Sequence, residues 1–164
     1  MKSLTLTLLI ATAGVSCIGC GPEIRVGTYD SRAVACAFYR SEANSQRLED
    51  LKARLKEAQS AGNAEEARRL RILPGQWQEL AHKQVFSDAP IPGVIERIAD
   101  KLPKIQEKTG VDKIVDKRRY SNLCAHRIDV TDAMVDLFDP TDDTRKVISE
   151  LVKHPPVRGP IHKH

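Results

Sequence analysis

The first pattern in the chain is an alternation of apolar and polar positions near the amino terminus. In EIRVGTYD, Ile24, Val26 and Thr28 fall on one face and the residues between them on the other. A period of two residues is typical of a β-strand, because successive side chains point to opposite sides of a sheet. Asp30 and Ser31 follow this strand, and either residue is a suitable N-cap for a helix.

The apolar period then changes to that of a helix. No Pro or Gly interrupts residues 32–61, which allows one helix of about 30 residues and roughly 45 Å. In its second half the apolar residues recur at steps of three, four and three between charged residues: Leu48, Leu51, Leu55 and Ala58. A stripe this narrow is typical of a helix that packs on a single coiled-coil partner.

A turn and a second helix with a matching stripe supply that partner. Gly62 and Asn63 tolerate the left-handed conformation that ends a helix, and helical sequence resumes at Ala64. Its apolar positions again recur at steps of three and four: Leu70, Leu73, Trp77 and Leu80. Matching stripes across a short turn predict an antiparallel helical hairpin. Because Pro74 removes a backbone donor, we expect a kink or break at that point of the second helix.

A third helix is predicted between residues 87 and 110. The proline-rich SDAPIPG, directly after Phe86, ends the hairpin. A broader apolar face follows it: Val94, Ile95, Ile98, Leu102 and Ile105. Pro103 is expected to bend this helix, and Gly110 is expected to end it.

Two β-like runs come next. VDKIVDK, residues 111–117, is short and rich in β-branched residues, and a further strand is predicted within NLCAHRIDV, residues 122–130. Thr131 is placed to cap a short helix, and DPTDD to cap a last helix that runs to about Lys153. Residues 154–164 show no periodicity and are expected to be disordered.

These elements predict an α+β fold with a small sheet. The amino-terminal strand and the late strands are expected to form the sheet, so that residues 21–40 and 88–153 make a compact base. The hairpin, residues 41–87, projects from this base as a coiled-coil arm. The helical middle of the chain is then an insertion between strands that lie side by side.

Composition and charge add two constraints. Only 4% of the 164 residues are aromatic, which leaves little with which to fill a large core and favours burial by self-association. The net charge is +4, and acidic and basic residues alternate along the chain. Because no basic stripe is present, nucleic acid is not an expected partner.

Residues 1–20 are interpreted as a signal peptide. Lys2 gives the positive start, and residues 4–15 form an apolar stretch too short to span a bilayer. CIGC then resembles the end of a bacterial lipoprotein signal, in which Cys20 is lipidated and becomes the mature amino terminus. Alternatively, ordinary cleavage after residues 11–13 leaves both Cys17 and Cys20 in the mature chain. In either case export to the periplasm is expected, and a lipid on Cys20 would anchor the protein to the membrane.

Two cysteines remain beside the predicted sheet segments, Cys36 and Cys124. In an oxidising compartment they can form a disulfide, and closing so long a loop would stabilise the fold by roughly 4 kcal/mol in the chain-entropy model. The alternative is two buried thiols that never meet, since Cys is among the most buried residue types.

No enzymatic motif is found in the sequence. G-x-S-x-G, Walker and H-E-x-x-H patterns are all missing from it. The Asp residues between 129 and 143 lack the loop spacing of a calcium hand and are interpreted as helix caps and a solvated face. The histidines near the carboxyl terminus have no Cys or carboxylate spaced to complete a metal site. We therefore expect no catalysis, cofactor or metal site.

Trp77 stands out on the predicted arm. An indole between only two helices cannot be covered wholly, so part of it is expected to face solvent or a bound protein. Alternatively, the indole fills a gap opened by a kink at Pro74. The other residues assigned to contacts of the arm or of a bound protein are Leu48, Leu51, Leu55, Arg68, Arg69 and Arg71. For the three arginines, a solvated surface beside nearby glutamates is the alternative interpretation.

The order of these elements resembles the OmpH/Skp family of periplasmic chaperones. VGTYDSRAV leads from a strand into a helix, VDKIVDK matches the later strand, and Asp129 to Asp132 match a D-[IV]-T-D helix start. The resemblance covers roughly residues 24–138. It implies a homotrimer whose arms enclose unfolded outer-membrane proteins without ATP.

An alternative function is a membrane-anchored scaffold or adaptor of the envelope. Only three residues separate Cys20 from the first strand, so a lipid there would hold the base close to the membrane. Such a protein would bind one defined partner and would have no chaperone activity.

Overall fold

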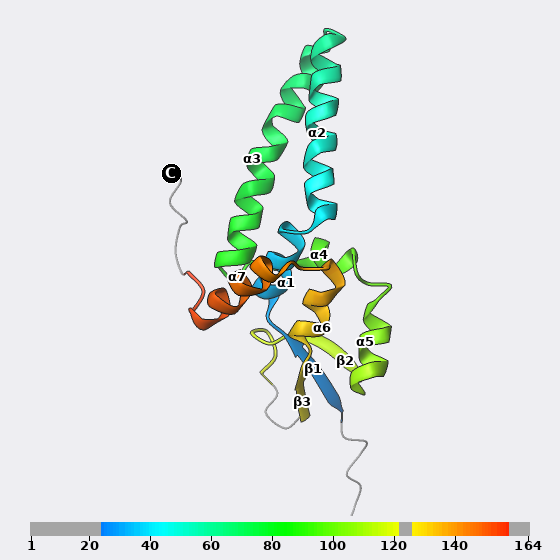
Figure 1. Cartoon of the computed structure of the whole chain (residues 1–164), viewed down its shortest axis with the longest axis vertical. Helices are drawn as coiled ribbons and strands as arrows, with labels where there is room; N and C mark the ends of the chain where they lie inside the picture. Colours follow the sequence, from blue (N-terminus) through cyan, green and yellow to red (C-terminus); the bar gives the residue numbers. More distant parts are fainter. Residues whose placement is uncertain (1–23, 122–125, 158–164) are drawn as a thin grey trace, which may run out of the picture.

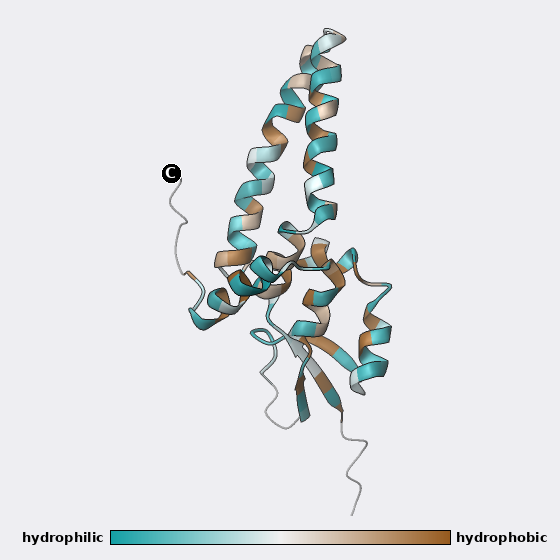
Figure 2. Cartoon of the chain, in the orientation of Figure 1, coloured by the Kyte–Doolittle hydropathy of each residue, from teal (hydrophilic) through white to brown (hydrophobic). Residues whose placement is uncertain are grey.

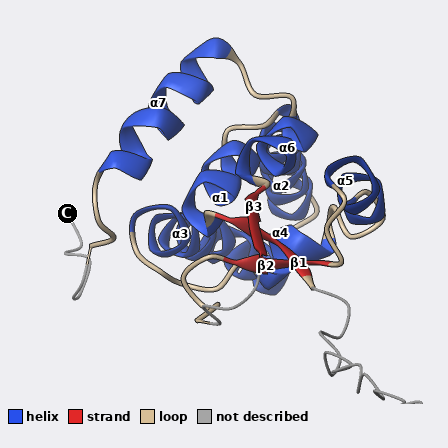
Figure 3. Ribbon diagram, turned by 90° about the horizontal axis from the view of Figure 1, so that it is seen from below, coloured by secondary structure: helices blue, strands red, loops and turns tan. Residues whose placement is uncertain are grey.

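The structure, a computed structural model, describes residues 24–121 and 126–157 and is a mixture of helices with one small sheet (Figure 1). The strands are β1 (Arg25–Tyr29), β2 (Lys113–Asp116) and β3 (His126–Asp129). The helices are α1 (Ser31–Tyr39), α2 (Glu42–Ser60), α3 (Ala64–Phe86), α4 (Pro92–Glu96), α5 (Leu102–Thr109), α6 (Thr131–Val135) and α7 (Asp142–Lys153), with a 3₁₀ turn at Asp136–Phe138. The sheet lies at one end of the molecule (Figure 1), and in the view from that end α5 lies on one side of it and α3 and α7 on the other (Figure 3).

The sheet brings the start of the described chain next to its later strands, as predicted. The strand order is β2-β1-β3, and both pairs run parallel. Gly27 lies opposite Ile114 of β2 and Ile128 of β3. Parallel neighbours require long crossover connections, and residues 30–112 provide one of them.

The central strand is buried on both faces. Val26 is completely covered and Thr28 and Tyr29 are buried, whereas Ile24, just before the strand, is 53% exposed. Gly27 allows close packing, because a Cβ there would lie 3.1–3.3 Å from side-chain atoms of Val111, Ile114 and Val130. Burial on both faces is usual for a parallel strand that helices cover.

Helix α1 forms the middle of the core. Asp30 is its N-cap, as predicted, and accepts hydrogen bonds from the Arg32 and Ala33 amides. All of its residues from Ser31 to Phe38 are buried, and they pack against α3, α6 and α7. Small side chains at Ala33, Ala35 and Ala37 let these elements approach closely.

The single helix predicted over residues 32–61 is wrong. α1 ends at Tyr39, and α2 begins at Glu42 with Ser41 as its N-cap. The Ser41 hydroxyl donates to the Phe38 carbonyl and accepts from the Asn44 amide. Serine offers the backbone an alternative to the helical hydrogen bond, and here that alternative redirects the chain.

α2 and α3 lie side by side and extend away from the sheet, joined by residues 61–63 (Figures 1 and 2). Apolar contacts between them centre on Ala58, Ala67 and Leu70. A kink or break was predicted at Pro74, and the break is wrong, because α3 continues through Pro74 to Phe86. Leu73 on one side of Pro74 packs towards α2 and Trp77 on the other packs towards α1, so tertiary contacts hold the helix across the missing donor.

The third predicted helix is two short ones. The α-helical geometry is interrupted between Glu96 and Leu102, and Pro103 lies in the first turn of α5 rather than bending a longer helix. Proline is well tolerated in a first turn, where its missing N–H has no helical partner. Gly110 ends α5 in the left-handed conformation, φ 66°, as predicted.

The carboxyl-terminal part covers α1. α7 runs from Asp142 to Lys153, close to the predicted end, and Thr141 caps it. The prediction that Thr131 caps α6 is wrong. Val130 is the N-cap of α6, and the Thr131 hydroxyl accepts a hydrogen bond from the Asp30 amide instead.

The predicted disorder is also wrong for residues 154–157. The His154 carbonyl accepts from Arg32, and the Val157 amide donates to the Phe86 carbonyl. Residues 158–164 lie outside the described part of the chain.

Candidate functional site

A groove of about 670 Å³ lies where α2 and α3 meet the base. We call it the root groove. It is lined by Phe38, Tyr39, Arg47, Trp77, Leu80, Gln84, Pro90, Pro92, Gly93, Val94, Glu96 and Arg97. These residues come from the end of α1, the start of α2, the carboxyl-terminal half of α3 and the segment that includes α4. The volume falls within the range of about 300–1,000 Å³ typical of ligand sites.

Three aromatic rings form one wall of the root groove. The Trp77 ring lies 5.4 Å from that of Tyr39 and 6.1 Å from that of Phe38, in edge-to-face arrangements. The Phe38 and Tyr39 rings are 5.0 Å apart. Edge-to-face contacts stabilise such clusters by about 0.5–1.5 kcal/mol per pair beyond their buried area. The chain has few aromatic residues, and it concentrates three of them here.

Two buried side-chain amides hold these rings in place. Asn44 accepts from the Trp77 indole N–H at 3.0 Å and donates to the Tyr39 carbonyl at 2.9 Å. Gln84 accepts from the Tyr39 hydroxyl at 2.7 Å and donates to the Pro90 carbonyl at 2.6 Å. Both amides are about 5% exposed. They connect α1, α2, α3 and the segment before α4, so the wall of the groove is fixed by hydrogen bonds as well as by packing.

Two guanidinium groups lie over the rings. The Arg47 Cζ is 4.0 Å from the centroid of the Trp77 ring, and the Arg97 Cζ is 5.4 Å from that of Phe38. Burial raises the pKa of the Tyr39 hydroxyl, although the charges of Arg47 and Arg97 act to lower it. The hydroxyl therefore stays protonated at neutral pH and continues to donate to Gln84.

Trp77 lies at the junction of α3 with α1 and not in a gap at Pro74. It is half-buried, with its N–H bonded and its ring against Phe38 and Tyr39. The indole is therefore partly exposed, as expected from the sequence, and its exposed part lines the root groove.

The three leucines singled out on α2 are all half-buried: Leu48, Leu51 and Leu55. Leu51 and Leu55 pack on the cluster between α2 and α3, so their first role is to hold the two helices together.

The three arginines on α3 lie outside the root groove and are exposed: Arg68, Arg69 and Arg71. Arg69 is paired with Glu66 at 2.7 Å. Arg68 and Arg71 line a pocket of about 370 Å³ beside the 61–63 turn. The structure does not bring these arginines together with Trp77.

The cysteine predictions fall largely outside the described residues. Cys36 is buried in α1, and burial raises the pKa of its thiol although Arg40 acts to lower it. Cys20 and Cys124 lie outside the described part of the chain. Lipidation of Cys20 and a disulfide between Cys36 and Cys124 therefore stay predictions.

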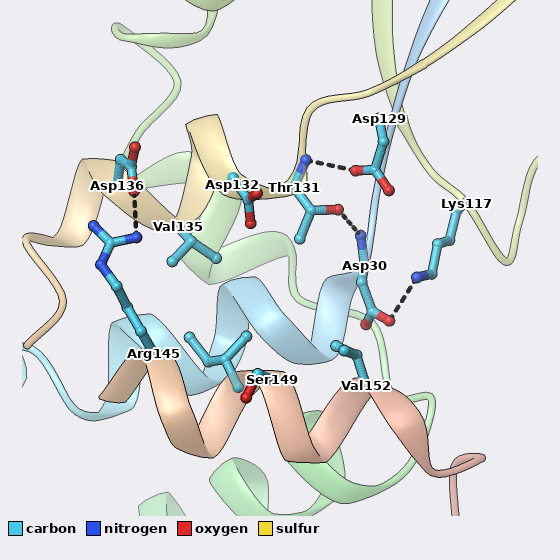
Figure 4. A pocket seen from close by; sticks show the side chains of 11 residues that line it. Asp30, Lys117, Asp129, Thr131, Asp132, Val135, Asp136, Arg145, Ser149 and Val152 are labelled. Atoms are coloured by element: carbon cyan, nitrogen blue, oxygen red, sulfur yellow. Dashed lines mark hydrogen bonds and ion pairs between the residues drawn. The ribbon is translucent and has the colours of Figure 1, made fainter. Parts of the chain in front are cut away.

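A second cavity, of about 760 Å³, lies at the carboxyl ends of the three strands, between α6 and α7 (Figure 4). We call it the strand-end pocket. Asp30 follows β1, Lys117 follows β2, and Asp129 ends β3, so the parallel sheet delivers three charged side chains to one edge. The carboxyl edge of parallel strands is where ligands bind in open α/β sheets.

Most charges in the strand-end pocket are already paired. Lys117 Nζ is 2.8 Å from the Asp30 carboxylate, and Arg145 is 2.9 Å from Asp136. The Asp129 carboxylate accepts from the Thr131 amide at 2.8 Å. Within the described residues no group of three or more His, Cys, Asp or Glu side chains is arranged to hold a metal ion. We therefore interpret the charged groups of this pocket as structural: one ion pair joins the ends of β1 and β2, and the other joins the 3₁₀ turn to α7.

The residues that shape the root groove were not all found from the sequence. Trp77 was singled out, whereas Phe38, Tyr39, Asn44, Gln84 and Arg97 were not. Asn44 and Gln84 occur in helical segments rich in polar residues, where a buried amide cannot be told from an exposed one. The available signal was the pair of adjacent aromatic residues at the end of α1, in a chain with few such residues.

Comparison of the chain with models of protein families, with curated proteins and with solved structures finds no match in any of the three. None of the helices in the described ranges is both long enough and apolar enough to cross a bilayer.

Proposed function

We propose that this protein is an ATP-independent, holdase-type chaperone of the periplasm that binds unfolded outer-membrane or other envelope proteins. In this proposal α2 and α3 form the projecting antiparallel arm, and the root groove is where an apolar segment of the unfolded chain binds. The observation that carries the proposal is the groove of about 670 Å³ with a wall of three aromatic rings at the base of the two helices.

The surface of α3 supports this proposal. Ile72, Leu80 and Phe86 are 52%, 41% and 46% exposed, and they follow the same helix from its middle to its end. Hydrophilic residues separate the apolar ones on α2 and α3 (Figure 2), and they include charged residues of both signs. A surface with separate apolar contacts and many solvated charges can hold unfolded segments weakly at several points.

The base supports a further part of the proposal, self-association. β2 and β3 are both edge strands of a three-stranded sheet, and their residues are half-buried or exposed. An unpaired edge is a ready site for another chain. A homotrimer assembled through the bases, with the arms around a bound chain, is the arrangement that the resemblance to the OmpH/Skp family implies.

The test is suppression of aggregation. A chemically denatured outer-membrane β-barrel protein is diluted with and without the mature chain carrying Cys20→Ser, and light scattering is followed. We expect suppression at a near-stoichiometric ratio. Failure of the protein to reduce scattering would contradict the chaperone proposal.

A pair of variants on α3 tests the place of binding. Leu80→Glu puts a charge into the root groove, whereas Ile72→Glu puts the same charge two turns away on an exposed position outside it. We expect Leu80→Glu to lose most of the suppression and Ile72→Glu to lose much less of it, because Ile72 supplies only one of several weak contacts outside the groove. Equal loss in both variants would show that the exposed face of the arm, rather than the groove, holds the client.

The second candidate function is an envelope scaffold that binds one defined partner. The specific observation in its favour is the fixed groove wall, because Asn44 and Gln84 make it rigid, and rigid sites suit a single ligand. A scaffold would bind its partner in the native state and would leave the scattering of denatured barrel proteins unchanged.

A further inference from the structure

We propose that the root groove selects polypeptide segments in which a carboxylate lies next to a large apolar side chain. The inference rests on the proposed function, because it names the chemistry of the segment that binds. The apolar side chain would contact Trp77 and Leu80, and the carboxylate would be bound by Arg47 and Arg97.

The first argument is that neither of these two arginines has a carboxylate partner among the described residues. Several other arginines are paired: Arg54 and Arg69 with Glu66, and Arg145 with Asp136. For Arg47 and Arg97, by contrast, the described residues place no carboxylate oxygen within 4.0 Å. Their guanidinium groups lie against the aromatic rings of Trp77 and Phe38 instead.

The second argument is the geometry of those ring contacts. The Arg47 and Arg97 Cζ atoms lie 4.0 and 5.4 Å from the ring centroids of Trp77 and Phe38, and neither guanidinium donates a hydrogen bond to another described residue. Five N–H donors are available on each arginine, in a fork that matches the two oxygens of a carboxylate. The ring contacts thus place Arg47 at Trp77 and Arg97 at Phe38, while the N–H donors of both arginines have no acceptor among the described residues.

The third argument is the charge balance of the groove lining. Arg47 and Arg97 are the cations that line it, and Glu96 is the carboxylate, which leaves a net positive charge. Both arginine charges also reach the Tyr39 hydroxyl, whose pKa they act to lower. An anionic group in the groove would complement this field, whereas a cationic group would be repelled.

An internal Asp or Glu and a free chain terminus both supply a carboxylate, and the experiment separates them. Labelled peptides with one central Phe are compared by fluorescence anisotropy: Phe-Asp against Phe-Asn, both with amidated ends, and a terminal Phe with a free carboxylate against its amide. We expect each acid to bind more tightly than its isosteric amide, by about five-fold for each arginine that it contacts. The larger of the two differences identifies the source of the carboxylate.

Variants assign the effect to the groove. Arg97→Gln removes an exposed charge and should reduce the preference for the acid, and Arg47→Gln provides a second measurement. Arg71→Gln is the control, since Arg71 is an exposed arginine on α3 that lies outside the groove; it should leave the preference unchanged. Equal affinity for acid and amide would overturn the inference, and so would a preference that survives both groove variants.

The chaperone proposal and this inference can fail separately. Acid-selective peptide binding without suppression of aggregation would support the inference and favour the scaffold function. Suppression of aggregation without acid selectivity would overturn the inference and leave the chaperone function in place.

Discussion

Lys117 Nζ lies 2.8 Å from the carboxylate of Asp30, which is almost completely buried, and so connects the residue after β2 to the residue after β1. The same carboxylate caps α1 through the Arg32 and Ala33 amides, while the Asp30 amide donates to the Thr131 hydroxyl after β3. One residue thus connects all three strand ends and the central helix. Its loss should therefore affect the whole base.

Asp30→Ala should lower the free energy of unfolding by about 3–5 kcal/mol, because it leaves the Lys117 and Arg32 charges and two helix amides without their acceptor. Asp30→Asn keeps an acceptor for the amides and should lose less. Urea unfolding followed by circular dichroism measures both. Asp143→Asn is the control, since Asp143 pairs with Arg40 at the surface and is 73% exposed; its loss should be about 1 kcal/mol or less. An equally small loss for Asp30→Ala would contradict this role.

Acid should weaken the Asp30 contribution. Burial of Asp30 acts to raise its pKa, but the hydrogen bond and charge of Lys117, with the Arg32 amide and charge, outweigh burial and lower the pKa. A lowered pKa means that the stability from Asp30 is present above the unfolded value of about 3.9 and is lost as pH falls through the folded value. The difference in unfolding free energy between wild type and Asp30→Asn should therefore be constant near neutrality and shrink below about pH 4. A difference that grows in acid would mean that the pKa is raised.

Alkali should destabilise the protein through Tyr29. Burial and the nearby Asp116 charge raise the pKa of Tyr29 to about 12, although Arg119 acts to lower it. A raised pKa gives stability that is present below the unfolded value of about 10 and is lost as pH rises through the folded value. Subtracting the phenolate absorbance of Tyr29→Phe from that of wild type should show one tyrosine that ionises about two pH units above an unfolded one. Ionisation near the ordinary value would show that the ring is accessible.

Local sequence signals predicted much of the base. Alternation at Arg25–Tyr29 and the β-branched run at Lys113–Asp116 each identify a strand without further information. Asp30 as an N-cap and Gly110 as a left-handed helix end are equally local, because each depends on the chemistry of one residue. That β1 pairs with the later strands followed from their order along the chain.

Other features depend on contacts that a local pattern does not contain. The break at Ser41 forms because its hydroxyl bonds the Phe38 carbonyl, and α1 holds Phe38 in the core. Pro74 was expected to kink or break α3, yet packing on both sides of it keeps the helix continuous. Burial of Asn44 and Gln84 is set by Trp77 and Tyr39, which lie 33 and 45 residues away from them. The root groove is a product of these distant contacts.

The contact between α2 and α3 should melt independently of the sheet. Leu70 is 1% exposed in a small cluster with Ala58 and Ala67, so Leu70→Ala should lower local stability by about 2–5 kcal/mol. Hydrogen exchange should then speed up along α2 and α3 while amides of β1 and α1 keep their protection. Ile72→Ala, at an exposed position on the same helix, should change little. Faster exchange in β1 would show that the two helices and the base unfold together.

Asn44 should control the environment of the only tryptophan in the chain. Asn44→Ala removes the acceptor of the Trp77 indole N–H and the donor to the Tyr39 carbonyl, so it should lower the free energy of unfolding by about 1–3 kcal/mol. The indole would then be freer to bond water, and its fluorescence should shift to longer wavelength in the folded protein. Gln46→Ala is the control, because Gln46 is an exposed amide on the same helix that donates a hydrogen bond to Glu42. An unshifted spectrum in Asn44→Ala would mean that ring packing alone positions Trp77 in the root groove.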